Sequence, residues 1–123
     1  MGRPARKRGM VKPAYIPDRG DIVWTDFNPQ AGREQAGKRP ALVLSPKAYN
    51  SKTGLAVMVP ITSHVKGYPF EVAIQTKSIS GVALTDHLKN LDWKARGVSF
   101  AGQASASVLD EATAKIAALL VIS

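Results

Sequence analysis

The chain has 123 residues, 45% of them apolar, and it contains no cysteine. This length suits one domain with one modest core, and no apolar run approaches the roughly 20 residues of a membrane span. The lack of cysteine excludes disulfides, thiolate catalysis and cysteine-based zinc sites. Because no apolar signal core follows the basic N-terminus, we expect a cytoplasmic protein.

The charge is strongly positive but unevenly distributed. Seventeen Lys and Arg oppose nine Asp and Glu, for a formal net charge of +8. Such an excess favours a polyanionic partner, most often nucleic acid. Residues 1–14 hold five cations and no acid, so the other 109 residues carry only 12 cations against 9 acids. The folded part is therefore mildly basic, and each site must be argued separately.

Residues 1–14 are predicted to form a disordered basic arm, since they combine two prolines and two glycines with few large apolar groups. One interpretation is a non-specific phosphate tether; the alternative takes Met10 as the true first residue. Residues 15–123 are predicted to form a single domain.

The predicted strands follow in chain order. Residues 21–27 (DIVWTDF) alternate with period two, as a half-buried strand does. A polar, glycine-bearing loop spans residues 28–38. Residues 39–45 (RPALVLS) are apolar on both faces, like a central strand, and Pro40 is confined to the start of this strand. Residues 47–54 favour a short helical turn or loop. Further strands are predicted at residues 55–63, at 70–75, within 81–91 and near 97–100.

The C-terminus changes to a helical period. Ser107 is the predicted N-cap, with Asp110 and Glu111 in the first turn. One helical face is predicted to consist of Leu109, Ala112, Ile116 and Leu120. Five or six short strands with one terminal helix predict a mainly β fold, a small, strongly bent antiparallel sheet or barrel.

Two side chains at strand ends are candidates for chemistry. Alternation along residues 55–63 turns Val57, Val59 and Ile61 to the core and Thr62 outward. Arg39 begins the preceding strand, where Pro40 restricts its backbone to extended conformations. Its planar donor fork suits two phosphate oxygens. The alternatives are a solvated threonine and an ordinary surface arginine.

The preceding loop is a candidate flap. Gly32 and Gly37 bracket four residues and would let the loop move and approach a ligand closely. Glu34 could act there as a base or bind a protein partner; the alternative is a mobile, solvated loop.

The histidines give little support for catalysis or metal binding. Asp86 and His87 are predicted on one strand with side chains on opposite faces, so they are not expected to form an acid–base pair. His64 and His87 lie 23 residues apart, without metal-ligand spacing. No metal site or cofactor is expected, and there is no phosphate-binding glycine loop of a known type.

Several motifs resemble the MazF/PemK toxin endoribonucleases, the mRNA interferases of bacterial toxin–antitoxin pairs. They are PDRGDIVWTDFNP (17–29), EQAGKRPALVLSP (34–46), YN (49–50), KTG (52–54), VPIT (59–62), KGYPFEV (66–72) and GVAL (81–84) with Asp86. The likeness runs from about Tyr15 to about Val121. The sequence departs from it in the N-terminal arm, in His87 where glutamine is common, and in residues 99–102, which lack a basic pair.

The resemblance implies an SH3-like antiparallel barrel with short helices and a C-terminal helix, assembled as a homodimer. It implies catalytic roles for Arg39, Thr62 and Glu34, and metal-independent cleavage of single-stranded RNA at short sequences. It also implies a cognate antitoxin whose acidic C-terminal segment occupies the RNA groove, and DNA binding by the toxin–antitoxin complex. The expected RNA-binding residues are Arg33, Gln35, Lys38, Asn50, Lys52, Ser63, Lys66, Tyr68, Asp86, His87, Lys94 and Arg96.

Two other functions remain open at this point. One is a toxin of the same fold that binds a protein such as DNA gyrase, because fold alone does not decide function. The other is a non-catalytic RNA-binding barrel that uses basic and aromatic residues such as Tyr49, Tyr68, Lys52 and Lys94. For the endoribonuclease, the absence of a protein nucleophile predicts attack by the 2′-hydroxyl of the RNA, leaving a 2′,3′-cyclic phosphate and a 5′-hydroxyl.

Overall fold

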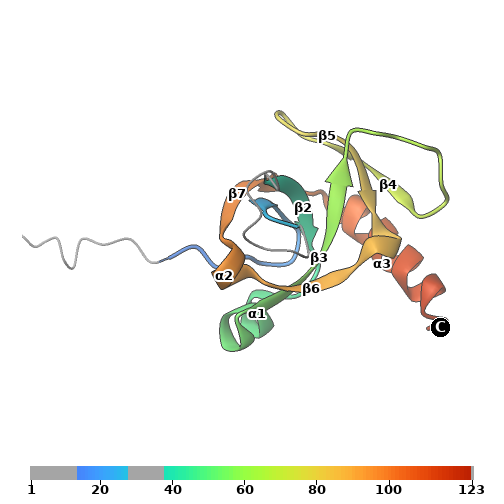
Figure 1. Ribbon diagram of the computed structural model, residues 1–123. Coiled ribbons are helices and arrows are strands. Elements are labelled where there is room, and N and C mark those ends of the chain that lie inside the picture. Colours follow the sequence, from blue (N-terminus) through green and yellow to red (C-terminus); the bar gives the residue numbers. More distant parts are fainter. Residues whose placement is uncertain (1–13, 28–37, 123) are drawn as a thin grey trace, which may run out of the picture.

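The computed structural model describes residues 14–27 and 38–122 (Figure 1). The predicted arm, apart from its last residue, and the flap with Arg33, Glu34 and Gln35 lie outside the described residues. Within the described part, no helix is long and apolar enough to cross a membrane.

The described residues form a mainly β fold with a long C-terminal helix. The elements are β1 (Asp21–Thr25), β2 (Arg39–Val43), α1 (Lys47–Thr53), β3 (Leu55–Thr62), β4 (Glu71–Gln75), β5 (Ser80–Leu84), the 3₁₀-helix η3 (Thr85–His87), β6 (Lys89–Asp92), α2 (Trp93–Arg96), β7 (Val98–Gln103) and α3 (Ala106–Leu119). This part of the chain thus contains seven strands, where the sequence predicts five or six. The sheet runs β4-β5-β3-β2-β1-β7, with β6 also on β3, and its strand pairs are antiparallel.

Strand β3 is shared by two parts of the sheet. Along one edge its first half pairs with β6, from Leu55 opposite Asp92, and its end pairs with β5, where Thr62 faces Val82. Pro60 lies between these two stretches, where its missing N–H costs little. Because β3 pairs with β2 along its other edge, the sheet curls into the half-barrel seen in Figure 1, with the β4–β5 hairpin projecting from it.

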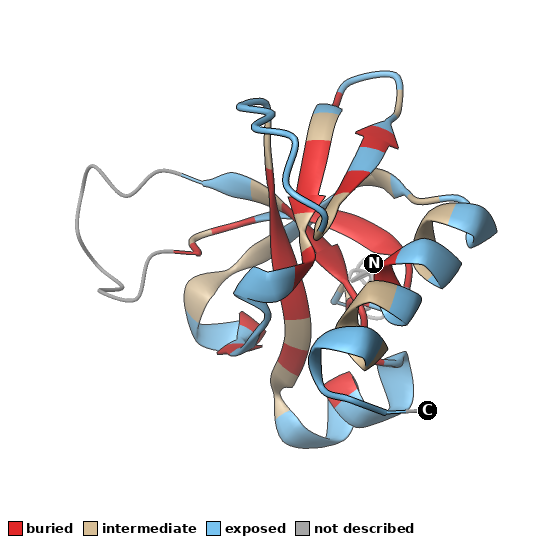
Figure 2. Ribbon diagram, turned by 90° about the vertical axis from the view of Figure 1, so that its right-hand side faces the viewer, coloured by how far each residue is buried: buried red, intermediate tan, exposed pale blue. Residues whose placement is uncertain are grey.

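Both faces of β3 are buried. Val59 and Ile61 belong to one core with Ile22 and Leu42, which confirms the predicted valine face. Met58, on the opposite face, is also fully buried, in a second core with Val23, Ala41, Val43 and Trp93. The curl of the sheet encloses this second face, as the buried strand segments of Figure 2 show.

Helix α3 begins two residues earlier than predicted. Ser105, not Ser107, is the N-cap, and its Oγ accepts a hydrogen bond of 3.2 Å from Val108 N. Ala112 is buried against the first core, and Leu109 and Ile116 pack partly against it, as predicted. Leu120 was wrongly assigned to this face: it is 58% exposed, because the helix ends at Leu119.

The predicted strand within residues 81–91 is interrupted by η3. Thr85 is buried and donates twice to the carbonyl oxygen of Phe70, from its N at 3.2 Å and from its Oγ1 at 2.5 Å. These hydrogen bonds turn the chain away from the sheet directly after β5, so that strand pairing stops at Leu84. Asp86 and His87 therefore lie on a tight turn, and the prediction that they occupy opposite faces of a strand is wrong.

Candidate functional site

An open cavity of about 500 Å³ lies where β2 begins and β3 ends. The start of β4, the turn η3 and the loop after β3 complete its wall; this loop is the long yellow-green segment beside β4 in Figure 1. The floor is apolar, with Phe27, Pro60, Ile61 and Leu84. The polar lining residues are Arg39, Thr62, His64, Lys66, Tyr68, Glu71, Asp86, His87 and Lys89.

The β2–β3 ladder brings Arg39 and Thr62 to the same place. Ala41 faces Pro60 and Val43 faces Met58, so each pair of residue numbers sums to 101. The observed pairs end at Ala41 and Pro60; the same register, continued by two residues, would set Arg39 opposite Thr62, and both residues line the cavity. Side chains directly opposite in an antiparallel pair share a face and stand about 5 Å apart at Cβ. The guanidinium and the hydroxyl thus project from adjacent strands into one cavity, from positions 23 residues apart in sequence.

Both side chains keep hydrogen-bonding groups that a ligand in the cavity could use. Thr62 Oγ1 accepts a hydrogen bond of 3.1 Å from His64 N, which leaves its hydroxyl hydrogen for an acceptor in the cavity. Arg39 is exposed, and among the residues that the structure describes no carboxylate forms an ion pair with it. Such a guanidinium can take an anion in bidentate geometry.

Gly81 lets β5 approach the end of β3 closely. A Cβ at this position would lie 2.2 Å from the carbonyl oxygen of Thr62 and 3.1 Å from the Cα of Ser63. Both neighbours are backbone atoms, so they cannot move aside as a flexible side chain can. The absence of a side chain at Gly81 therefore helps to set the position of Thr62.

The loop after β3 is held by Glu71. Its Oε2 accepts from Lys66 N at 3.0 Å and its Oε1 from Gly67 N at 2.9 Å. Its own N donates to Tyr68 O at 3.1 Å. Lys66 and Tyr68 are thereby placed on the cavity wall, with Lys66 Nζ 5.8 Å from the centre of the Tyr68 ring.

The turn η3 supplies the opposite wall. His87 Nε2 lies 3.9 Å from Asp86 Oδ1, and both side chains are partly exposed. Lys89 follows, with its Nζ 5.6 Å from the centre of the Phe27 ring. The described lining thus holds three cations, Arg39, Lys66 and Lys89, against two carboxylates, Glu71 and Asp86. This balance favours an anionic ligand over a metal cation, and nowhere in the described residues do three His, Asp or Glu side chains gather as a metal site would need.

Six of the predicted site residues line this cavity: Arg39, Thr62, Lys66, Tyr68, Asp86 and His87. Ser63 lines a smaller neighbouring cavity of about 290 Å³ that shares Arg39 and Thr62 with the main one.

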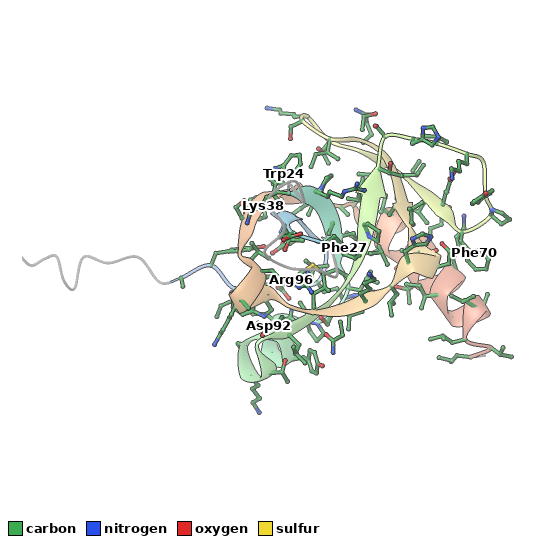
Figure 3. All side chains as sticks on the ribbon, in the orientation of Figure 1. Trp24, Phe27, Lys38, Phe70, Asp92 and Arg96 are labelled. Carbon is green, nitrogen blue, oxygen red and sulfur yellow. The ribbon has the colours of Figure 1, made fainter. Side chains whose placement is uncertain are left out.

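Five predicted residues that the structure describes line neither cavity; four of them are Lys38, Lys52, Lys94 and Arg96. Lys38 and Arg96 lie together, with Lys38 Nζ 3.4 Å from Arg96 O, and Arg96 donates to Asp26 O at 2.9 Å. Figure 3 labels both Lys38 and Arg96 on the half-barrel. Lys52 is on α1, and Lys94 is on α2 with its Nζ 5.7 Å from the Trp93 ring centre.

The prediction that Asn50 binds RNA is wrong. Asn50 is fully buried on α1, and its side chain is used inside the protein. Its Oδ1 accepts from Ser45 Oγ at 2.6 Å, and its Nδ2 donates to Pro17 O at 2.8 Å and to Ser45 O at 2.9 Å. The asparagine therefore joins three segments of the chain, and it exposes no donor or acceptor to a ligand.

Sequence reasoning missed Glu71, Lys89, His64 and the floor residue Phe27. Glu71 had a usable signal: in FEVAIQ the buried positions are Val72 and Ile74, so Glu71 belongs to the outward face. Phe27 and Lys89 had no local signal, because their contact joins residues 62 positions apart.

Comparison with known proteins extends this description. Residues 18–120 match the family described as "PemK-like, MazF-like toxin of type II toxin-antitoxin system". The chain is 49% identical over 106 residues to the endoribonuclease toxin MazF of Escherichia coli K12, which covers 86% of this chain and 96% of that one.

Solved structures agree with this match. The MazF crystal structure (Form-I) from Deinococcus radiodurans has a TM-score of 0.80 and 51% identity, covering 88% of this chain and 99% of that one. A MazE–MazF crystal structure (Form-II) from the same organism has a TM-score of 0.80 and 46% identity, covering 89% and 100%.

The family match covers nearly all of the described chain, and the curled antiparallel sheet with its C-terminal helix is the fold of the MazF structures. The resemblance inferred from the sequence is confirmed: this chain belongs to the PemK-like, MazF-like toxins of type II toxin–antitoxin systems.

Proposed function

We propose that the protein is an endoribonuclease toxin that cleaves single-stranded RNA in the cavity between β2, β3 and η3. The observation that carries this proposal is that Arg39, at the start of β2, and Thr62, at the end of β3, line the same cavity. It is supported by 49% identity to a protein named an endoribonuclease toxin.

The RNA supplies its own nucleophile in this mechanism. The chain has no cysteine, and the 2′-hydroxyl already stands beside the scissile phosphorus, so attack within the substrate avoids the entropy of bringing two reactants together. Attack breaks the P–O5′ bond. The products are a 2′,3′-cyclic phosphate and a 5′-hydroxyl.

The protein then needs to stabilise charge and move two protons. The Arg39 guanidinium neutralises the two negative oxygens of the phosphorane, and the Thr62 hydroxyl donates to one of them. The 2′ proton passes either to Glu34 or to Arg39, and the departing 5′-oxygen takes its proton from the Arg39 guanidinium. Glu34 belongs to the segment outside the described residues, so the proposal for it rests on the resemblance alone.

The rest of the cavity binds the chain on either side of the cut. Lys66 contacts a phosphate and Tyr68 stacks on a base, while Asp86 and His87 read base edges. The other predicted RNA contacts, apart from Asn50, extend this path along the surface. No metal ion is required, because Arg39 supplies the charge that a metal would otherwise provide.

The protein is further proposed to form a homodimer and to bind an antitoxin. For the antitoxin, the support is the MazE–MazF crystal structure from Deinococcus radiodurans; for the homodimer, it is the family resemblance. An acidic antitoxin segment would compete with RNA for Arg39, Lys66 and Lys89.

Two substrates test the proposal. Purified protein incubated with a long mRNA should give discrete fragments ending in 2′,3′-cyclic phosphate, with undiminished rate in excess EDTA. An oligonucleotide with a single 2′-deoxy sugar 5′ of the mapped cut should bind but stay intact. Cleavage of this oligonucleotide at a comparable rate would refute the intramolecular attack, and the absence of any RNA fragments would refute the endoribonuclease.

A further inference from the structure

The carboxylate of Glu71 is unexpected in this cavity. It begins β4, is only partly buried and lines the same cavity as Arg39 and Thr62. A polyanionic substrate is repelled by a negative charge at such a position. A role other than direct contact with the RNA would explain its presence.

The contacts of Glu71 suggest that role. Its two carboxylate oxygens accept from the consecutive backbone N–H groups of Lys66 and Gly67, and its own N–H donates to Tyr68 O. One residue therefore fixes three successive residues of an exposed loop. Gly67 has a φ of 86°, which glycine adopts at little cost and which directs the two N–H groups to one acceptor.

Glu71 is itself well anchored. Its carbonyl oxygen accepts from Lys115 Nζ at 2.9 Å, and Lys115 also pairs with Glu111 at 3.1 Å on α3. The carbonyl oxygen of the preceding Phe70 accepts both hydrogen bonds of Thr85; Figure 3 labels Phe70 beside α3. The loop is thus tied through Glu71 to a helix and to the turn η3.

The side chains on this loop are suited to single-stranded nucleic acid. Tyr68 is 58% exposed, and the Lys66 ammonium lies 5.8 Å from its ring centre. A stacking ring beside a phosphate-binding cation is the combination by which proteins hold an unpaired nucleotide. Without Glu71, residues 66–68 would sample several conformations in the free protein and would lose conformational entropy when RNA binds. Glu71 reduces this loss because it orders the loop beforehand.

We propose that Glu71 is a positioning residue for RNA: its carboxylate preorganises residues 66–68 so that Lys66 and Tyr68 hold one nucleotide next to the cut. This inference rests on the proposed function. It predicts a role in substrate binding and not in the chemical step, which separates it from a general base at the same position.

The test uses Glu71→Gln, because an amide offers one acceptor oxygen where the loop needs two. Asp110→Asn is the control: it removes the same charge from an exposed site on α3, away from the cavity. We expect Glu71→Gln to raise KM, and the Kd of the 2′-deoxy oligonucleotide, roughly tenfold, the scale of one lost stacking contact. We expect kcat to change less than about twofold, and the slope of log Kd against log salt to fall by up to about 0.7, as for one lost phosphate contact.

A double-mutant cycle checks whether Glu71→Gln changes Kd through Lys66 and Tyr68. In a Lys66→Ala, Tyr68→Ala background, Glu71→Gln should change Kd by less than about twofold, because the side chains that it positions are gone. A fall in kcat with unchanged Kd, or effects that simply multiply, would overturn the proposal. If Glu71→Gln does not fold by circular dichroism, Lys66→Ala and Tyr68→Ala decide, since unchanged Kd in both would also overturn it. If the parent does not cleave RNA, the proposed function fails, and the Kd of an unmodified single-stranded RNA oligonucleotide, measured for the same variants, still decides the role of Glu71.

Discussion

Gly81→Ala tests whether the position of Thr62 depends on the close approach of β5. The added Cβ would lie 2.2 Å from the carbonyl oxygen of Thr62, whereas such contacts are almost never shorter than about 3.0 Å. The two backbones must therefore separate by roughly 0.8 Å (3.0 − 2.2) at the end of β3. Because Thr62 and Val82 are paired there, the displacement acts directly on the residue that carries the hydroxyl.

Two magnitudes follow from this displacement. Forcing one methyl group into a packed region typically costs about 1–3 kcal/mol of stability. Misplacing a catalytic group by about 1 Å can cost on the order of a hundredfold in rate. A shift of this size should therefore lower kcat by roughly tenfold to a hundredfold, while the protein stays folded at 25 °C.

The assay measures kcat and KM on an oligonucleotide with the mapped cleavage sequence, and the free energy of unfolding in urea. Gly102→Ala on β7 is the matched control, because its nearest contact to a new Cβ is Thr76 Cγ2 at 4.0 Å. The control should keep kcat within about twofold. A folded Gly81→Ala protein with parental kcat would show either that Thr62 does not take part in cleavage or that its position tolerates the shift.

Three other changes probe the site and the fold. Arg39→Ala should lower kcat on the order of a hundredfold or more, the scale for losing one preorganised donor, without changing the urea midpoint; a parental rate would contradict its assignment. Asn50→Ala should lower the free energy of unfolding by roughly 3–5 kcal/mol, because it removes the acceptor of the Ser45 hydroxyl and the side-chain donor to two carbonyl groups, those of Pro17 and Ser45. The exposed Asn90→Ala should cost less than about 0.5 kcal/mol, and equal effects would contradict the structural role of Asn50. Burial and the hydrogen bond to Asp21 raise the pKa of Tyr15, so its contribution is complete below the unfolded-state pKa of about 10 and is lost as pH rises further. Tyr15→Phe should thus be less stable than the parent at pH 7, and the difference should shrink at high pH; a difference that grows there would contradict this sign.

Local sequence was informative wherever the alternation along one strand, or the backbone restriction imposed by one proline, decided the local structure. The alternation in residues 21–27 and 70–75 identified β1 and β4, and the apolar run after Pro40 identified β2, because side chains alternate along any strand. Arg39 and Thr62 were found because strand ends are where a side chain can leave the core while its backbone stays fixed. The family motifs extended this reading to the fold, and the family match over residues 18–120 confirms the extension.

Features that depend on distant partners could not be read in this way. Residues 81–91 carry a strand-like pattern, yet the strand breaks at Thr85 because its side chain bonds Phe70, fifteen positions earlier. Asn50 resembles a surface asparagine in sequence and became a buried link only through Pro17 and Ser45. Glu71 acquired its role from the backbone of a loop that folds back onto it. Periodicity reports which side of an element a residue faces, whereas the curl of the sheet decides what lies on that side, and this curl is fixed by hydrogen bonds between segments far apart in the chain.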